Sequence, residues 1–282
     1  SPMPTPNLIW LSSYPKSGNT WFRAFLSNLM SEKDEPVHIN ELHSTPIASS
    51  RVMFDEYAGT AGSDLTMEEI DNLRPQVYRE ISGSSDELSF HKVHDAWKMN
   101  SRGEPVFPPD VTKAVIYFIR DPRDVAVSFA HHSSATLEKM VKNMADENFA
   151  FCDKNVKVYN QLRQDLSSWS GHVKSWVDES GLPVLVLRYE DMKNNTFPSF
   201  KRAVEYLGLD YPDSKIKLAL KNSDFRQLKE MEEKEGFSEK PIKMRSFFRE
   251  GRTGSYREEL SAELIERIER DHGEVMGRFG YD

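Results

Sequence analysis

The sequence is poor in the features that mark an extracellular, membrane-spanning or nucleic-acid-binding protein. Its 282 residues include one cysteine, Cys152, which excludes an intrachain disulfide and a cysteine-based zinc site. No apolar run approaches the roughly 20 residues that span a membrane. Acidic residues outnumber basic ones, 45 to 37, and the net charge of −8 argues against a nucleic acid or an anionic membrane as partner.

Other signals are absent as well. No signal peptide precedes the first apolar run, so we expect a cytoplasmic protein. No linker, low-complexity tract or internal repeat divides the chain, which predicts one domain over residues 1–282. Residues 1–6 are expected to be disordered or a cloning remnant. No cluster of metal-ligating residues is evident, so no metal is predicted.

Short apolar runs alternate with segments of helical periodicity along the chain. The predicted strands are residues 7–13, 88–93, 114–119 and 183–187. The predicted helices are residues 20–30, 64–81, 124–131, 162–179, 197–207 and 261–279. This alternation is typical of an α/β fold with a central, mostly parallel sheet flanked by helices. Ligands of such sheets bind where strands end, and the polar segments described next follow predicted strands.

The loop after the first predicted strand, residues 14–21, suits a phosphate group. A loop with glycine between a strand and a helix N-terminus presents backbone N–H groups and the positive end of the helix. Lys16 adds a full positive charge. Further donors are supplied by Ser17, Asn19 and Thr20. The ordinary ATP-binding loop needs lysine after a second glycine, whereas Lys16 precedes Gly18, so that match fails.

A second candidate phosphate site follows the strand 114–119. Arg120 closes this strand, and Ser128 lies eight residues later in the next predicted helix. A guanidinium and a hydroxyl held on rigid elements can clamp a terminal phosphate. Arg123 and Asp124 are interpreted as structural residues.

Together these two segments resemble the family of sulfotransferases that use 3′-phosphoadenosine 5′-phosphosulfate (PAPS). Residues 14–21 match the family's 5′-phosphosulfate loop nearly residue for residue, and Arg120 with Ser128 resembles its 3′-phosphate site. The resemblance implies a P-loop-type nucleotide fold, PAPS as co-substrate and 3′,5′-diphosphoadenosine (PAP) as product. The matched segments run from residue 9 to about residue 257, and residues 64–79 look like bacterial members of the family.

Further segments of the chain fit the adenine side of the same site. Tyr189 begins a Tyr-Glu-Asp-Met segment whose tyrosine, by resemblance, contacts the adenine. Ser223, Phe225 and Leu228 resemble the segment that covers the purine in the family. The resemblance places Trp21 on the other face of the purine.

Residues 248–256 resemble the segment that folds over the 3′-phosphate in the family. The residues implied to bind there are Arg249, Glu250 and Gly251. Glu250 departs from the pattern because the family often has lysine at this position. We therefore expect its side chain to point outward and Arg252 to compensate in charge.

The resemblance also assigns the catalytic groups. Transfer of a sulfonate requires that a proton be taken from the acceptor, which a group with a near-neutral pKa does best. Lys92-Val93-His94 resembles the family's Lys-Thr-His segment, which implies that His94 is the general base, with His91 as its rival. Lys92 is expected to stabilise charge on the transferring group, and Lys16 charge on departing PAP. The resemblance further implies that Ser128 holds Lys16 away until the acceptor arrives.

Two other functions stay open, and the acceptor is assigned only as a class. A P-loop kinase using ATP would need Mg²⁺ ligands and a complete Walker loop, whereas a non-catalytic nucleotide-binding module would need no base. Aromatic residues in variable regions indicate a small apolar or aromatic acceptor bearing a hydroxyl or amine. These residues, with one histidine, are Phe54, Tyr57, Trp97, Phe129, His131, Phe149 and Phe151.

Overall fold

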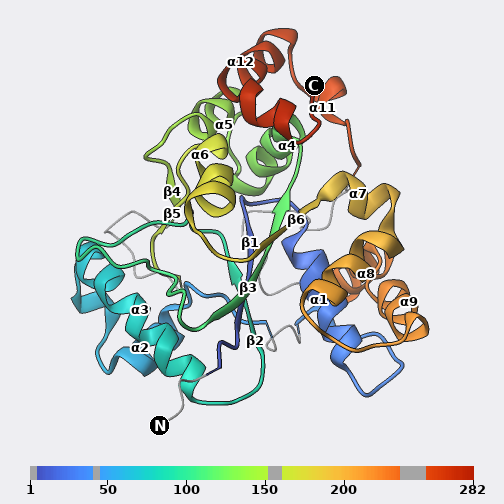
Figure 1. Ribbon diagram of the computed structural model, residues 1–282. Coiled ribbons are helices and arrows are strands. Elements are labelled where there is room, and N and C mark those ends of the chain that lie inside the picture. Colours follow the sequence, from blue (N-terminus) through green and yellow to red (C-terminus); the bar gives the residue numbers. More distant parts are fainter. Residues whose placement is uncertain (1–4, 41–44, 152–160, 236–251) are drawn as a thin grey trace. The chain divides into compact units, whose positions relative to one another are not determined.

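The computed structural model describes residues 5–40, 45–151, 161–235 and 252–282 (Figure 1). Its main sheet has four strands in the order β2-β1-β3-β6. They are β1 (Leu8–Ser13), β2 (Ser89–Val93), β3 (Thr112–Ile119) and β6 (Val184–Arg188). β1 and β2 run parallel, with Leu8 opposite Ser89 and Ser12 opposite Val93. The predicted α/β fold with a parallel central sheet and flanking helices is confirmed.

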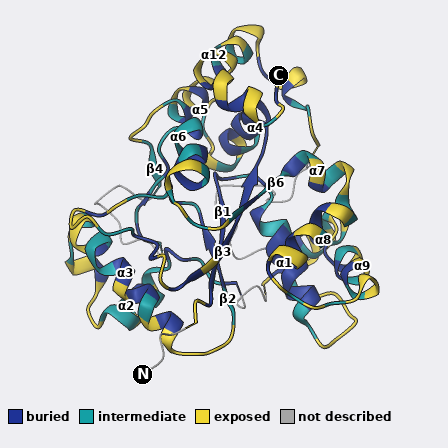
Figure 2. Ribbon diagram, in the orientation of Figure 1, coloured by how far each residue is buried: buried dark blue, intermediate teal, exposed yellow. Residues whose placement is uncertain are grey.

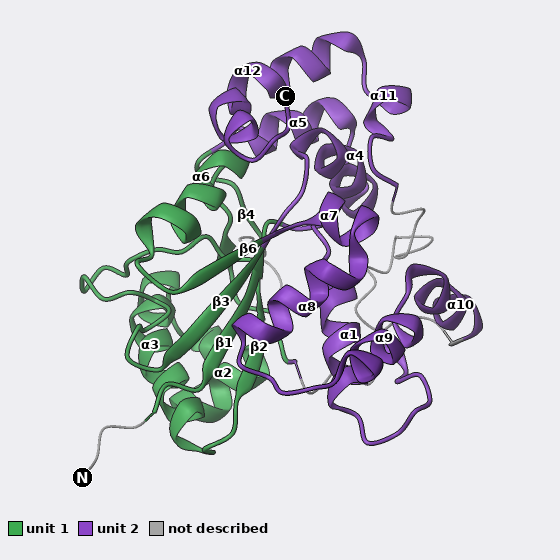
Figure 3. Cartoon of the chain, turned by 45° about the vertical axis from the view of Figure 1, so that its right-hand side comes forward, with its two compact units in different colours: residues 1–14, 46–117, 147–186 green, residues 15–45, 118–146, 187–282 purple. Residues whose placement is uncertain are grey.

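The chain forms two compact units, each assembled from separate stretches of sequence (Figure 3). Unit 1 comprises residues 1–14, 46–117 and 147–186, and unit 2 comprises residues 15–45, 118–146 and 187–282. β3 and β6 begin in unit 1, and their last residues belong to unit 2. Within the described ranges, no helix has both the length and the apolar character needed to cross a membrane.

Unit 1 is built around aromatic side chains that link the sheet to its helices. Its elements besides the strands of the main sheet are α2 (Arg51–Ala58), η2 (Gly62–Asp64), α3 (Met67–Gly83), β4 (Ala150–Phe151), β5 (Gln164–Asp165), α6 (Trp169–Lys174) and η3 (Ser175–Glu179). Trp10 of β1 packs edge-on against Tyr78 of α3 and against Phe107, each at 5.0 Å between ring centroids. Trp176 packs on Phe107 at 5.1 Å. These rings are fully buried, and they fix α3 and η3 against the strands.

Unit 2 carries most of the helices. They are α1 (Asn19–Met30), α4 (Pro122–Ser133), α5 (Leu137–Met144), α7 (Tyr189–Asn194), α8 (Thr196–Tyr206), α9 (Asp213–Asn222), α10 (Phe225–Glu235), α11 (Tyr256–Glu259) and α12 (Ala262–Arg278). Figure 1 shows α1, α8 and α9 side by side and α4, α5 and α12 as a second group. Phe22 of α1 packs on Phe118 at the end of β3 and on Phe200 of α8, at 5.1 and 5.6 Å. Figure 2 shows β1 and β3 almost entirely buried and one face of α12 exposed.

One predicted helix, over residues 162–179, is wrong in its first part. The helix begins at Trp169, because the Ser168 side chain caps it by accepting the Gly171 N–H at 2.9 Å. Ser167 has a left-handed φ of 60°, which interrupts any helix that starts earlier. Apolar spacing continues across this boundary, so periodicity alone missed the cap. The other predicted strands and helices are confirmed with ends shifted by at most three residues, the largest shift being residue 64 against Met67.

Candidate functional site

The loop after β1 has the backbone geometry of an anion-binding loop. Lys16 has a left-handed φ of 67°, and Gly18, the N-cap of α1, has φ 100°. A non-glycine residue keeps such a conformation only where its surroundings impose it, and such residues concentrate at functional sites. Among the described residues, no side chain caps the N-terminus of α1, because its N-cap residue is Gly18, and its first turn contains no acidic residue. Its positive end is therefore available to an anion.

The side chains around this loop fit a phosphorylated ligand. Ser17 is buried, and its Oγ has no hydrogen-bond partner among the described residues. The same holds for Nε of the buried Arg120. Buried polar atoms are normally paired, so both atoms fit a bound polar group. A Cβ at Gly18 would lie 3.1 Å from Cδ2 of Tyr189, a tight contact, in a backbone conformation with φ 100° that residues with side chains rarely adopt.

Arg120 joins three predicted nucleotide-binding segments within unit 2. Its Nη1 donates to the Lys16 carbonyl at 2.9 Å, and its guanidinium lies 4.2 Å from the centre of the Tyr189 ring. Its Nη2 donates to the Arg252 carbonyl at 3.4 Å. Ser128 lies half-buried on α4 in the same unit. The structure therefore brings Lys16, Arg120 and Tyr189 together within unit 2.

Residues predicted to contact the adenine also meet in unit 2. Trp21 and Phe225 pack against the buried Leu228. Lys193, which was not predicted, has its Nζ 5.9 Å from the Trp21 ring centre and 5.3 Å from that of Phe225. Burial and the charge of Arg120 lower the pKa of Lys193. Its position directly after the Tyr-Glu-Asp-Met segment was the only signal for it.

Other predicted residues have structural contacts or lie outside the described chain. The hydroxyl of Ser223, the residue that follows α9, donates to Ala219 O of that helix at 2.6 Å. Asp124 accepts the backbone N–H groups of Gly254 and Tyr256 at 2.8 and 3.1 Å, consistent with a structural role. Arg252 pairs with Glu258 at the surface. The predicted 3′-phosphate residues Arg249, Glu250 and Gly251, like Cys152, lie outside the described residues.

His94, the predicted base, is the first residue after β2 in unit 1. Its Nδ1 lies 2.9 Å from the Ser13 carbonyl oxygen. Because a carbonyl can only accept, Nδ1 carries the proton of the neutral ring and Nε2 carries the basic lone pair. Phe151 of β4 lies edge-on to the His94 ring at 6.5 Å, and Phe149 lies 6.3 Å from Phe151. The basic nitrogen thus belongs to a half-buried ring with aromatic neighbours.

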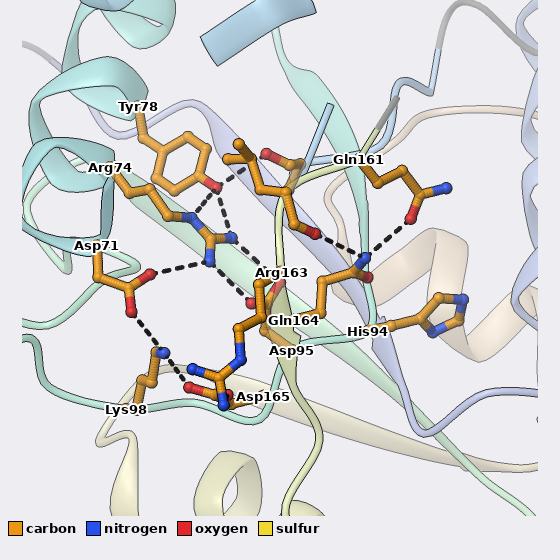
Figure 4. A network of polar contacts seen from close by, with 12 residues as sticks. Asp71, Arg74, Tyr78, His94, Asp95, Lys98, Gln161, Arg163, Gln164 and Asp165 are labelled. Atoms are coloured by element: carbon orange, nitrogen blue, oxygen red, sulfur yellow. Dashed lines mark hydrogen bonds and ion pairs between the residues drawn. The ribbon is translucent and has the colours of Figure 1, made fainter. Parts of the chain in front are cut away.

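The segment that begins at His94 is held by side chains from elsewhere in unit 1, and Figure 4 shows one of them, Arg74, at the Asp95 carboxylate. His172 Nε2 lies 2.8 Å from the His94 carbonyl oxygen, and Trp176 Nε1 donates to the Asp95 carbonyl at 2.8 Å. The Asp95 carboxylate accepts two hydrogen bonds from Arg74, at 2.8 and 3.1 Å. Both the backbone and the side chain that follow the predicted base are therefore fixed.

Arg74 and Asp95 form a buried ion pair that sequence analysis missed. Both side chains are 1% exposed, and Arg74 also donates to the Tyr78 hydroxyl at 2.9 and 3.0 Å. Tyr78 in turn donates to Ala48 O. Burial lowers the pKa of Arg74, but Asp95, Tyr78 and Asp71 together raise it well above its ordinary value. The available signal was Arg74 itself, which lies on the apolar stripe of the predicted helix 64–81.

The other candidates near the predicted base are buried. His91 is 1% exposed in β2, with Nε2 2.6 Å from Ser89 Oγ, and burial lowers its pKa to about 4. His172 is fully buried with its Nδ1 2.7 Å from the Tyr117 hydroxyl, and burial lowers its pKa to about 4 as well. Lys92 is largely buried in β2. Burial of His91 and His172 favours His94 as the histidine that can meet an acceptor.

The sequence is similar to known proteins over nearly its whole length. The chain matches the family model described as the sulfotransferase domain over residues 6–280. It is 25% identical to flavonol 3-sulfotransferase of Flaveria bidentis over 98% of this chain and 83% of that protein. It is also 25% identical to cytosolic sulfotransferase 12 of Arabidopsis thaliana over 93% of this chain and 75% of that protein.

The fold is shared with solved structures. Mouse sulfotransferase SULT7A1, complexed with PAP, aligns with a TM-score of 0.59 at 20% identity and covers 96% of this chain and 84% of its own. At that identity the likeness concerns the fold alone. The family model, in contrast, covers nearly the whole sequence. The chain therefore belongs to the sulfotransferase family.

Proposed function

We propose that this sulfotransferase moves the sulfonate of PAPS onto a hydroxyl or amine of a small apolar or aromatic acceptor, with His94 as the general base. The observation that carries the proposal is the bond from His94 Nδ1 to the Ser13 carbonyl, which leaves Nε2 as the basic nitrogen. The aromatic rings of Phe149 and Phe151 support an aromatic acceptor. The name of the Flaveria relative, a flavonol sulfotransferase, supports the same class.

We assign the nucleotide to residues of unit 2. The 5′-phosphosulfate is assigned to the α1 N-terminus with Lys16, Ser17, Gly18, Asn19 and Thr20. Arg120 and Ser128 are assigned to the 3′-phosphate, as are Arg249, Glu250 and Gly251. The adenine is assigned to Trp21, Tyr189, Ser223, Phe225 and Leu228. Support comes from the contacts that join Lys16, Arg120 and Tyr189, and from the buried atoms of Ser17 and Arg120 that fit a bound polar group.

The proposed reaction is a single in-line displacement without a covalent enzyme intermediate. His94 Nε2 takes the proton as the acceptor oxygen or nitrogen forms its bond to sulfur. The bond from sulfur to the phosphate oxygen breaks, and its electron pair leaves on PAP. Lys16 stabilises that negative charge, Lys92 supplies a second cation, and Ser128 holds Lys16 until the acceptor binds. A sulfonate carries less negative charge than a phosphoryl group, so the reaction does not require a metal.

The base assignment is tested by His94→Ala. We expect turnover with radiolabelled PAPS to fall about 10²- to 10⁴-fold, the usual contribution of a general base, with PAP affinity nearly unchanged. Acceptors for the assay come from a screen of phenols, flavonols, sterols and amines. His132→Ala, at a half-buried histidine on α4 that is assigned to no site, serves as the control. Normal turnover of the His94 variant would remove this residue from the mechanism.

The nucleotide assignment is tested by thermal unfolding with PAP or ADP, each with and without Mg²⁺. A ligand that binds only the folded state raises the unfolding midpoint. We expect PAP to raise it without metal and ADP to have little effect, because only PAP carries the 3′-phosphate assigned to Arg120. A preference for ADP with Mg²⁺ would instead support nucleotide chemistry of the kinase type.

We further infer that the chain is one sulfotransferase domain that acts in the cytoplasm. Its single cysteine suits a reducing compartment, and the Arabidopsis relative is named as cytosolic. Fractionation of cells that express the full protein tests this inference, and recovery in a secreted or membrane fraction would contradict it.

A further inference from the structure

A buried tyrosine far along the chain from every predicted site residue contacts the ends of two strands. Tyr281 follows α12 and is 4% exposed. Gly280 has a left-handed φ of 82°, and this turn directs the tyrosine back toward the strands. The Tyr281 hydroxyl lies 2.7 Å from Glu190 Oε2 and 3.3 Å from the carbonyl of Ile119. The Arg188 guanidinium lies 4.9 Å from the centre of its ring.

Glu190 connects the ends of β3 and β6. Its Oε1 accepts the backbone N–H of Asp121 at 2.9 Å, while its Oε2 accepts the Tyr281 hydroxyl. Glu190 follows Tyr189 in sequence, and Asp121 follows Arg120. One carboxylate therefore ties together the two backbone positions that carry Arg120 and Tyr189.

These contacts lead directly to the nucleotide residues proposed above. The Arg120 guanidinium lies 4.2 Å from the Tyr189 ring centre and donates to the Lys16 carbonyl at 2.9 Å. A shift of Glu190 would move Tyr189 and the backbone of Asp121, and with them the cation–aromatic pair that supports the Lys16 loop. All of these residues belong to unit 2.

The charges agree with this arrangement. Burial raises the pKa of Glu190, while the Asp121 N–H, the Tyr281 hydroxyl and Arg120 lower it. Burial and the Glu190 carboxylate raise the pKa of Tyr281 far above its ordinary value, so the phenol remains the donor. Each oxygen of the Glu190 carboxylate thus accepts a hydrogen bond. These bonds stabilise the negative charge of Glu190 beside a site that is assigned to a polyanion.

We propose that Tyr281 is a positioning residue for PAPS, acting through Glu190 on Arg120 and Tyr189. This inference rests on the nucleotide assignments of the proposed function. It predicts that nucleotide affinity depends on a hydroxyl that does not itself contact the nucleotide.

The test is calorimetric titration of the full-length protein with PAP, which needs no knowledge of the acceptor. We expect Tyr281→Phe, which keeps the ring but removes the hydroxyl, to weaken PAP binding about three- to tenfold, the scale of one hydrogen bond. Glu190→Ala should weaken it at least as much. Glu190→Gln should stay within about twofold of wild type, because its amide can accept from Asp121 and donate to the Tyr281 oxygen. Tyr206→Phe, at an exposed tyrosine on α8, is the matched control.

The unfolding midpoint of each variant without ligand separates positioning from general stability. Lower midpoints with PAP affinity unchanged in both Tyr281→Phe and Glu190→Ala would overturn the proposal, since Tyr281 would then only stabilise the fold. Arg120→Ala distinguishes this failure from failure of the proposed function. If Arg120→Ala weakens PAP binding while the other two do not, only the role of Tyr281 is lost. If none of the three matters, the nucleotide assignment of Arg120 fails as well.

Discussion

The Lys16 loop in unit 2 and the His94 segment in unit 1 are held in place by different means. The loop depends on backbone conformation: a left-handed lysine, a left-handed glycine and the start of α1. The His94 segment depends on side chains that come from far along the chain, chiefly Arg74 and His172. Backbone geometry restricts residue type at fixed spacing, whereas a side-chain network can be assembled from any positions that the fold brings together.

This difference predicts that the His94 segment is most sensitive to loss of a buried charge. Arg74→Met should lower the free energy of unfolding by about 3–5 kcal/mol, because it leaves the Asp95 carboxylate buried without its partner. Arg79→Met is the matched control on the same helix. Arg79 pairs with Glu104 and Asp110 near the surface, so its loss should change stability by less than about 1 kcal/mol. Urea unfolding measures both, and equal effects would contradict the comparison.

The loop should be most sensitive to a change of backbone. Gly18→Ala places a Cβ 3.1 Å from Tyr189 in a left-handed conformation, and we expect a loss of about 1–2 kcal/mol in stability. PAP affinity should fall together with stability, because Gly18 caps the helix assigned to the 5′-phosphosulfate. Gly103→Ala is the control, since Gly103 also has a positive φ, of 75°, but nothing lies within 4 Å of an added Cβ. Equal PAP affinity in the two variants would show that the close approach to Tyr189 is unimportant.

A further effect is expected from pH, and it again belongs to the His94 segment. His172 has its pKa lowered from 6.5 to about 4 by burial, so below pH 6.5 the unfolded chain binds a proton that the folded chain does not. Its contribution to stability is complete above pH 6.5 and is lost as pH falls toward 4, by up to about 1.4 kcal/mol per pH unit. His172→Gln retains a donor toward the His94 carbonyl but does not titrate.

Urea unfolding of wild type and His172→Gln between pH 7 and pH 5 measures this difference. Comparison of the two proteins cancels the other groups with shifted pKa values, including His91, His272 and Glu190. We expect the free energy of unfolding of the variant to change less steeply with pH, by a slope that corresponds to as much as one proton. Identical slopes would show that His172 is protonated within the fold.

The sequence predicts the structure where local geometry or alternation determines residue type. The four strands of the main sheet were predicted, as were α1, α3, α4, α8, α12 and the part of residues 162–179 from Trp169 on. No bounds were predicted for α2, α5, α7, α9, α10 and α11. The start of α3 shows such local geometry, since Thr66 and Glu69 form a capping box there. The helix over 162–179 failed because the Ser168 cap competes with an apolar period that continues past it.

The sequence alone determined the alternation of strands and helices, the phosphate-type loop and membership of the sulfotransferase family, since each depends on residues close together in the chain or in a fixed order. Only the tertiary structure decided which nitrogen of His94 is basic, that Arg74 pairs with Asp95, and that Tyr281 reaches Glu190. These pairings join residues from 21 to 91 positions apart. No local spacing predicts these pairings, because they depend on burial and on the paths that the intervening segments follow in the fold.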